Sequence, residues 1–179
     1  MVDKKRINAA NKLAAKTVVV PHGNPRFEYS RITPSIFLGT DMCCRPHFKS
    51  ELLRRGVRAD ISLREKHIDS PFGVDYFLWL PTKDHYAPTQ KQLLVGATTI
   101  DTLVRQKVNV YVHCKAGHGR SPTLVAAYFV LAGKSAKEAV AYVKKRRPGI
   151  HPNMRQLSAL KKFEEMLKRK TSKIKLIKQ

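Results

Sequence analysis

Apolar residues along the chain fall into short β-branched or aromatic runs, which alternate with longer stretches of helical spacing. The short runs predict strands at Ile36–Leu38, Val57–Leu63, Tyr76–Leu80 and Val108–Val112. The longer stretches predict helices at Pro46–Arg55, Thr89–Arg105, Ser121–Ala132, Ser135–Arg146 and Asn153–Arg169. Elements in this order predict an α/β fold, with a mostly parallel central sheet of about four to five strands flanked by helices.

The ends of the chain differ in composition from the predicted domain, which we assign to residues 30–168. Residues 1–29 are basic, and Pro21 and Pro25 indicate irregular backbone, so this segment is assigned as an N-terminal extension. Residues 169–179 form a basic tail in which lysines are interleaved with isoleucine and leucine. Such a tail suits an anionic lipid or membrane surface, with a solvated terminus as the alternative.

Composition bounds the class of protein. The chain has 179 residues, 42% of them hydrophobic, which is enough for one packed domain. No apolar stretch reaches the roughly 20 residues that span a bilayer. The N-terminus lacks the apolar segment of a secretory signal, and three cysteines make a poor disulfide framework, so we expect a cytoplasmic protein. A mitochondrial presequence is the alternative, because the first sixteen residues are basic and suit an amphipathic helix.

The formal net charge of +22 is the strongest signal in the composition. It suggests a polyanionic partner: nucleic acid, an anionic membrane surface or a phosphorylated substrate. The alternative is a solvated, lysine-rich surface. Charge alone does not choose among these.

The segment after the Val108–Val112 strand is where chemistry is expected, because ligands of such folds bind at the carboxyl ends of strands. It reads HCKAGHGRSP from His113 to Pro122 and joins a buried strand to a helix N-terminus. Backbone N–H groups in such a loop, together with the helix dipole, form an anion cradle. The residues predicted to bind a phosphate there are Lys115, Ala116, Gly117, His118, Gly119 and Arg120.

Cys114 stands at the mouth of this cradle and is the predicted nucleophile. A free thiol has a pKa of about 8.5, and the helix N-terminus and a nearby guanidinium favour the thiolate. Arg120 can bind two phosphate oxygens with its planar fork. Ser121 is placed to donate a hydrogen bond to the sulfur, and His113 is expected to order the loop rather than to act as a base.

Other interpretations of this motif fit less well. The lysine that follows the second glycine of an ATP-binding P-loop is missing. Cys114 has no second cysteine at zinc-ligand spacing, so no metal is predicted. A structural turn would not need cysteine, arginine and two glycines at these positions.

A cysteine and an arginine separated by five residues, preceded by His and followed by Ser, resemble the signature loop of the protein tyrosine phosphatase superfamily, most closely its dual-specificity branch. The stretches Ile36–Thr40, Thr123–Val130 and Arg147–Asn153 are also similar to that branch. The resemblance covers residues 30–168. It implies a phosphatase with a covalent phosphocysteine intermediate, no metal and no cofactor.

The resemblance also implies a general acid on a mobile loop, about thirty residues before the cysteine. Asp84 lies there, after a predicted strand and between two prolines. One carboxylic acid can protonate the leaving group and later deprotonate water. Among the rivals, Asp75 opens a strand, Asp69 lies too far upstream and His85 is the better competitor. An exposed loop aspartate without a catalytic role is the alternative for Asp84.

Three further positions receive supporting roles. In the dual-specificity branch an asparagine braces the catalytic loop, so the resemblance implies this role for Asn153. Gln156 is a candidate for positioning water, although polarity at a helix N-terminus explains it nearly as well. Cys43 or Cys44 is a candidate for a reversible disulfide with Cys114, with small buried apolar residues as the alternative.

The resemblance leaves the substrate open. Larger tyrosine-specific members carry an extra loop that deepens the pocket, and this chain shows no such segment. We therefore expect a monomer that dephosphorylates phosphotyrosine, phosphoserine and phosphothreonine on proteins. Cys-Lys-Ala-Gly at Cys114–Gly117 is also similar to phosphoinositide and phosphatidylglycerophosphate phosphatases, so a lipid phosphatase is the alternative.

Two more distant functions fit less well. RNA 5′-triphosphatases with a similar loop dispense with the aspartate acid, so Asp84 counts against a nucleic-acid substrate. Non-catalytic relatives usually lose the cysteine or the arginine, and both are present here.

Overall fold

A six-stranded sheet crosses the structure, a computed structural model that describes residues 17–20, 27–41, 45–66, 68 and 73–177. The strands are β1 Thr17–Val20, β2 Phe27–Arg31, β3 Ile36–Gly39, β4 Val57–Ser62, β5 Tyr76–Trp79 and β6 Asn109–His113. Their order is β1-β2-β3-β6-β4-β5. The pairs β3–β6, β6–β4 and β4–β5 are parallel, whereas β1–β2 and β2–β3 are antiparallel. The predicted α/β class and mostly parallel sheet are confirmed, with two strands added at one edge.

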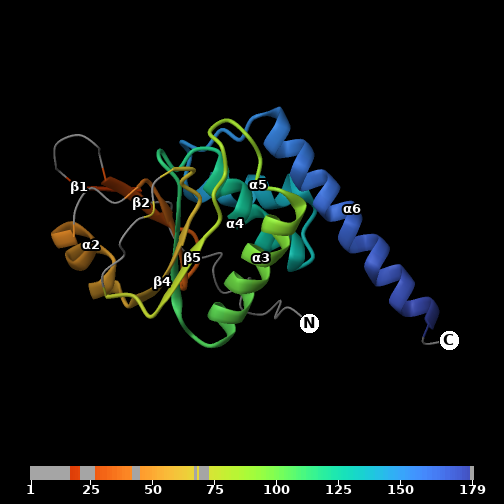
Figure 1. The fold of residues 1–179 in the computed structure, drawn as a ribbon, viewed down its shortest axis with the longest axis horizontal. Coiled ribbons are helices and arrows are strands. Elements are labelled where there is room, and N and C mark those ends of the chain that lie inside the picture. The colour runs from red at the N-terminus through yellow and green to blue at the C-terminus, as the bar shows by residue number, and fades with distance from the viewer. Residues whose placement is uncertain (1–16, 21–26, 42–44, 67, 69–72, 178–179) are drawn as a thin grey trace.

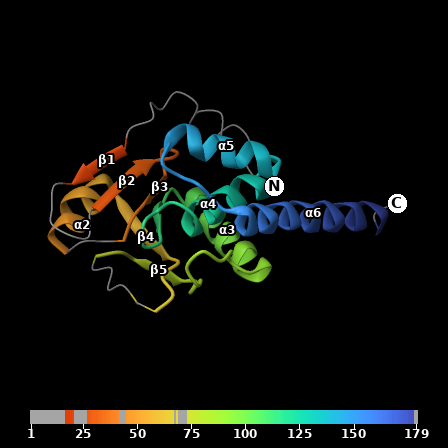
Figure 2. The same cartoon turned by 90° about the horizontal axis from the view of Figure 1, so that it is seen from above.

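Helices cover both faces of this sheet (Figures 1 and 2). They are α2 Arg45–Glu51, the short 3₁₀ helix η2 Leu53–Arg55, α3 Gln90–Arg105, α4 Arg120–Leu131, α5 Ala136–Arg146 and α6 Met154–Ile177. The helices α3 to α6 lie on one face and α2 on the other. The predicted helix Pro46–Arg55 is divided between α2 and η2, and α6 continues past Arg169. Gly56 ends η2 with a φ of 76°, a left-handed conformation that glycine adopts at little cost.

The two added strands were missed because their pattern is short and partly polar. The pattern predicts no strand before Ile36, yet Thr17–Val20 pairs with Phe27–Arg31, which in turn pairs with β3. In β2 the buried Phe27 and Tyr29 alternate with the less buried Glu28, which is the period of a strand with one face on the core. The assigned domain boundary at residue 30 therefore falls inside β2.

The larger core lies between the sheet and α3 to α6, and α4 is at its centre. Every residue of α4 from Arg120 to Val130 is buried, and the helix contacts α3, α5 and α6. Full burial of one leucine, valine or phenylalanine side chain contributes about 1.5–3 kcal/mol. This packing fixes the start of α4 close to the end of β6, so the short segment between them is held at both ends.

A smaller aromatic core covers the opposite face of the sheet. Its rings are those of Phe27, Tyr29, Phe37, Phe48 and Tyr111. The Tyr111 ring lies edge-on to Phe27 at 6.3 Å and to Phe48 at 6.2 Å. Such aromatic pairs add about 0.5–1.5 kcal/mol beyond the area that they bury. The N-terminal strands are therefore packed onto β6, the strand that leads to Cys114.

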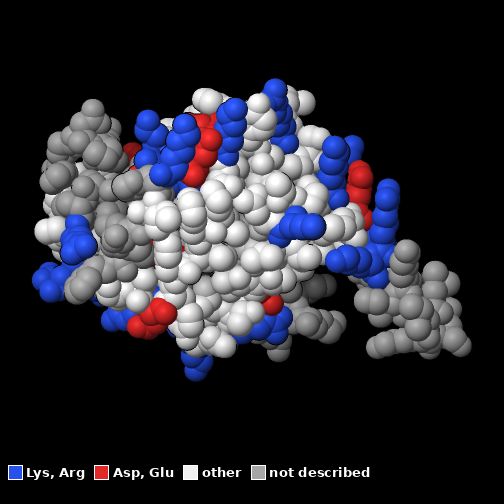
Figure 3. All heavy atoms as spheres, in the orientation of Figure 1, with Lys and Arg blue, Asp and Glu red and all other residues white. Residues whose placement is uncertain are grey.

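Basic residues far outnumber acidic ones in this chain. The sequence has 35 lysines and arginines against 13 acidic residues, and Figure 3 shows the basic side chains standing along α6. In the described part of the chain, no helix is both long and apolar enough to cross a bilayer.

Candidate active site

The cysteine loop, residues Cys114–Gly119, joins β6 to α4 at the carboxyl end of the parallel strands. Its start is fixed by backbone hydrogen bonds from residues that follow the neighbouring strands β3 and β4. The Asp41 amide donates to the Lys115 carbonyl at 3.1 Å, and the Leu63 amide donates to the His113 carbonyl at 2.9 Å. The predicted cradle thus lies where parallel α/β folds place their ligands.

Gly117 gives the loop its shape. Its φ is 68°, and a Cβ at this position would lie 2.5 Å from the Gly39 carbonyl oxygen. A side chain is therefore excluded both by conformation and by the close approach of β3. The Gly117 carbonyl accepts a hydrogen bond from Arg147 Nε at 3.2 Å, which fixes the orientation of this peptide.

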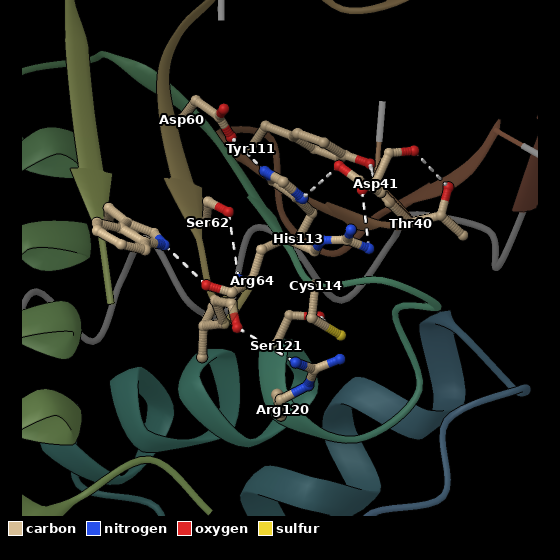
Figure 4. A network of polar contacts seen from close by, with 12 residues as sticks. Thr40, Asp41, Asp60, Ser62, Arg64, Tyr111, His113, Cys114, Arg120 and Ser121 are labelled. Atoms are coloured by element: carbon tan, nitrogen blue, oxygen red, sulfur yellow. Dashed lines mark hydrogen bonds and ion pairs between the residues drawn. The ribbon is translucent and has the colours of Figure 1, made fainter. Parts of the chain in front are cut away.

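Cys114 and Ser121 lie together where α4 begins, as Figure 4 shows. The Ser121 hydroxyl donates to Cys114 Sγ at 3.2 Å, as predicted from the sequence. Burial raises the pKa of the Cys114 thiol, but the Ser121 hydroxyl and amide, the Arg120 charge and the Gly117 amide together lower it by more. The net pKa lies below the ordinary thiol value, so the site favours the thiolate.

Arg120 is the first residue of α4 and its side chain is buried. Its Nη1 donates to the Thr82 carbonyl at 2.9 Å, and its Nη2 lies 2.9 Å from Asp84 Oδ1. The Asp84 side chain itself is 56% exposed. The structure therefore brings Asp84, thirty positions upstream of the cysteine, to the guanidinium of the cysteine loop.

The aspartate loop, residues 81–88, is anchored by three side-chain amides. Gln92 Nε2 donates to the Pro81 carbonyl at 2.9 Å. Asn153 Nδ2 donates to the His85 carbonyl at 2.8 Å, and Gln156 Nε2 donates to the carbonyl of the next residue at 3.1 Å. Asn153 was expected to brace the catalytic loop, and the structure places its side chain on the aspartate loop instead. The spacing of Asn153 and Gln156 did not reveal which loop they contact, because that contact joins segments about 70 positions apart.

His113 is buried within a polar network on the aromatic face of the sheet (Figure 4). Its Nε2 lies 3.3 Å from Asp60 Oδ1 and its Nδ1 lies 3.7 Å from Asp41 Oδ1. Arg64 Nη1 lies 3.0 Å from the second oxygen of Asp41. The Tyr111 ring is stacked on the imidazole, with ring centroids 5.3 Å apart. This network holds the residue before the cysteine in place.

The two aspartates of this network were not predicted from the sequence. Asp60 is 1% exposed. It is an acidic residue in the middle of a buried strand, and its neighbours in the sequence are apolar. A lone acidic residue in such a run was the available signal, because a buried carboxylate needs a polar partner. Asp41 gave no signal, since it follows β3 in a segment without regular pattern.

Arg147 is the other residue whose role was missed. Its side chain is 2% exposed, its Nη2 lies 2.6 Å from Glu28 Oε1, and its Nη1 donates to Ser30 Oγ at 3.4 Å. Because its Nε also holds Gly117, this side chain ties the cysteine loop to β2. Prediction of the contact required β2, which the sequence pattern did not reveal.

Lys115, Ala116 and His118 form the rim of the cysteine loop; the first two are exposed and the third is partly buried. The His118 ring lies 4.8 Å from that of His151. Burial first, and then the charges of Arg147 and His151, lower the pKa of His118. The neutral form of its imidazole is therefore favoured.

Two predictions concern metal and redox chemistry. Among the residues that the structure describes, no group of three or more His, Cys, Asp or Glu side chains is arranged to hold a metal ion. Cys43 and Cys44 lie outside the described residues, so their pairing with Cys114 stays a prediction.

Comparison with known proteins adds independent findings. The family model described as "Dual specificity phosphatase, catalytic domain" matches residues 37–166. Human "Phosphatidylglycerophosphatase and protein-tyrosine phosphatase 1" is 31% identical over 171 residues, which are 86% of this chain and 82% of that protein. Human "Dual specificity protein phosphatase 16" is 30% identical over 160 residues, and the match spans 83% of this chain but 23% of that protein.

Two solved structures have a similar overall fold. The crystal structure of PTPMT1 superposes with a TM-score of 0.72 at 30% identity, covering 81% of this chain and 99% of that one. A crystal structure of PTPMT1 in complex with PI(5)P gives a TM-score of 0.71 at 27% identity, covering 80% of this chain and 98% of that one.

Proposed function

The chain belongs to the dual-specificity branch of the protein tyrosine phosphatase superfamily, and we propose that it hydrolyses phosphate monoesters through a phosphocysteine intermediate on Cys114. One observation carries the proposal. The Cys114 thiol, whose pKa is lowered, and the buried Arg120 guanidinium lie together at the start of α4, and Asp84 contacts that guanidinium. The three groups are the nucleophile, the phosphate ligand and the proton donor that such a reaction needs.

In the first half of the reaction, the Cys114 thiolate attacks phosphorus and a P–S bond forms. The bond between phosphorus and the ester oxygen breaks, and protonated Asp84 gives its proton to that oxygen. Arg120 and the loop amides bind the phosphate oxygens, whose charge they stabilise in the transition state. The phosphate takes the place of Asp84 Oδ1, which lies 2.9 Å from Nη2 of Arg120.

In the second half, water attacks the phosphorus of the phosphocysteine. Asp84, now a carboxylate, takes a proton from that water. The P–S bond breaks, inorganic phosphate leaves and the thiolate is restored. The Ser121 hydroxyl, 3.2 Å from Sγ, stabilises the negative charge that returns to sulfur.

The proposed substrates are phosphotyrosine, phosphoserine and phosphothreonine side chains of proteins. The family description and the match to dual specificity protein phosphatase 16 support this class. The exposed Lys115 and Ala116 support an open rim that admits both long and short phosphorylated side chains.

A phospholipid head group is the second candidate. The relative named phosphatidylglycerophosphatase and protein-tyrosine phosphatase 1 and the neighbour in complex with PI(5)P favour it. The exposed Lys115 adds a cation at the rim, which suits head groups with more than one negative charge.

A phosphate-release panel tests the proposal. Its substrates are phosphotyrosine and phosphothreonine peptides, phosphatidylglycerophosphate, a phosphoinositide and 5′-triphosphate RNA. We expect kcat/KM for the peptides to exceed that for the lipids by about tenfold or more. The opposite order would assign the lipid class.

Cys114→Ser is the matched control, because serine keeps the shape of the side chain and removes the thiolate. We expect this variant to lose turnover of every substrate by about 10³-fold or more, with its far-ultraviolet circular dichroism unchanged. Undiminished release of phosphate would refute the mechanism.

A further inference from the structure

Two amides at the start of α6 hold successive carbonyls of the aspartate loop. Asn153 Nδ2 donates to the His85 carbonyl at 2.8 Å, and Gln156 Nε2 donates to the Tyr86 carbonyl at 3.1 Å. We propose that this pair, the amide clamp, positions Asp84 for proton transfer. The inference rests on the proposed function, since it takes Asp84 as the proton donor.

The two clamp side chains also fix each other. Gln156 Oε1 accepts a hydrogen bond from the backbone N–H of Asn153 at 2.9 Å, and Asn153 Oδ1 accepts one from the backbone N–H of Gln156 at 3.1 Å. This is the reciprocal arrangement of a capping box at a helix N-terminus. Each side chain therefore anchors its oxygen in the helix end and leaves its nitrogen to hold the loop.

The aspartate loop needs such support. His85 has a φ of 63°, a left-handed conformation that is uncommon for residues with a side chain. The neighbouring Asp84 is 56% exposed, so packing does not determine where its carboxylate lies. The clamp holds the carbonyls of the two residues that follow Asp84, and the first of these, His85, donates its backbone N–H to Asp84 Oδ1 at 3.1 Å. The clamp therefore helps to fix the direction in which that carboxylate points.

The same clamp touches the cysteine loop. A Cβ on Gly119 would lie 2.8 Å from Gln156 Oε1 and 2.9 Å from its Nε2, so the carboxamide fills the space that this glycine leaves. Gln156 is 2% exposed and lies against the cysteine loop on one side and the aspartate loop on the other. It therefore fixes the position of Asp84 relative to the cysteine loop. Both members of the amide clamp are positioning residues.

The kinetic consequence depends on the leaving group. A poor leaving group needs the proton from Asp84, whereas a good one departs without it. Small displacements of a positioned group cost up to about 10²-fold in rate. A loosened clamp should therefore slow formation of the phosphocysteine selectively for substrates with poor leaving groups.

Gln156→Met tests the clamp, because methionine keeps the length of the side chain and removes both hydrogen bonds. With a series of aryl phosphates we expect kcat/KM, which reports formation of the phosphocysteine, to fall about 10-fold to 100-fold for the poorest leaving group and less than about threefold for the best. Met154→Leu, on the same turn but 79% exposed, should match the wild type throughout.

Asn153→Ala is the second variant, and it should steepen the dependence on the leaving group in the same way even if Gln156→Met disturbs the buried site. In an Asp84→Asn background, Gln156→Met should cause no further loss, since the group that it positions is already gone. An equal loss for every leaving group, or a full additional loss in that background, would overturn the clamp and leave the roles of Cys114 and Asp84 intact.

Failure of the proposed function itself would look different. An Asp84→Asn variant with wild-type dependence on the leaving group would overturn both the proton donor and the clamp. Wild-type turnover by the Cys114→Ser variant would instead show that Cys114 is not the nucleophile.

Discussion

The Cys114 side chain is 2% exposed, and burial alone would keep its thiol protonated at neutral pH. Hydrogen bonds from Ser121, the charge of Arg120 and the Gly117 amide reverse that effect. The nucleophile is thus produced by its immediate contacts. Among these contacts the Ser121 hydroxyl has two uses, because it stabilises the free thiolate and also the sulfur that leaves phosphorus.

Ser121→Ala separates these contributions at the scale of one residue. Loss of the hydroxyl raises the pKa of Cys114, so the midpoint of its alkylation rate against pH should move to higher pH. Breakdown of the phosphocysteine should slow by about 10-fold to 100-fold, because a hydrogen bond to a charged group contributes about 1.5–3 kcal/mol. Ser158→Ala, an exposed serine of α6, is the control, and an unmoved midpoint would contradict the assigned role.

At the scale of elements, the two faces of the sheet support the cysteine loop through different contacts. The face toward α4 is apolar and fixes the backbone of the cysteine loop. The aromatic face carries the buried contact between Asp60 on β4 and His113 on β6, within the sheet rather than at its edge. Both residues are 1% exposed, so neither has water to replace its partner.

Asp60→Ala should therefore destabilise the fold more than an average substitution. Removal of one partner leaves the other group buried without its polar partner, which costs about 1–3 kcal/mol. We expect a loss of this size in the free energy of unfolding, measured with urea. Asp75→Ala, an exposed aspartate just before β5, should change it by less than about 0.5 kcal/mol. Equal stabilities for the two variants would show that His113 is satisfied without Asp60.

At the scale of the whole molecule, the part of α6 that extends away from the sheet also carries exposed basic side chains. The C-terminal part of α6 extends away from the sheet in both ribbon views, and Lys168, Arg169 and Lys170 are exposed on it. A cation close to an anionic membrane contributes about 1 kcal/mol to binding. An extended basic helix is therefore suited to contact such a surface, while the cysteine loop lies at a distance from its tip.

Substitution of Lys168, Arg169 and Lys170 by glutamine tests this contact. We expect binding to phosphatidylglycerol vesicles to weaken by about 100-fold, with turnover of a soluble aryl phosphate unchanged. Raised salt should weaken binding of the wild type, since screening acts on exposed charges. A charge-matched variant with Lys137, Lys144 and Lys145 of α5 replaced should bind as the wild type does. Equal binding of both variants would assign attraction to net charge alone.

Local signals carried much of the prediction. The strand before Cys114, the loop glycines and the helix Thr89–Arg105 all follow from neighbouring positions, and the structure has them. Contacts between distant segments could not be predicted in this way. Arg147 reaches Glu28 across 119 positions, and Gln156 reaches Tyr86 across 70. Both depend on which elements become neighbours in space, and β2 had no strand signal strong enough to reveal it.

The link from Arg147 to Glu28 bears on how the catalytic unit should be delimited. The matched family region begins at residue 37, yet a fragment cut there would lack both Glu28 and Ser30. A guanidinium that is 2% exposed would then lose its carboxylate while it still held the Gly117 peptide. The smallest fragment that keeps this site intact therefore begins before β2, and this strand belongs to the active unit when the chain is shortened, fused or grafted.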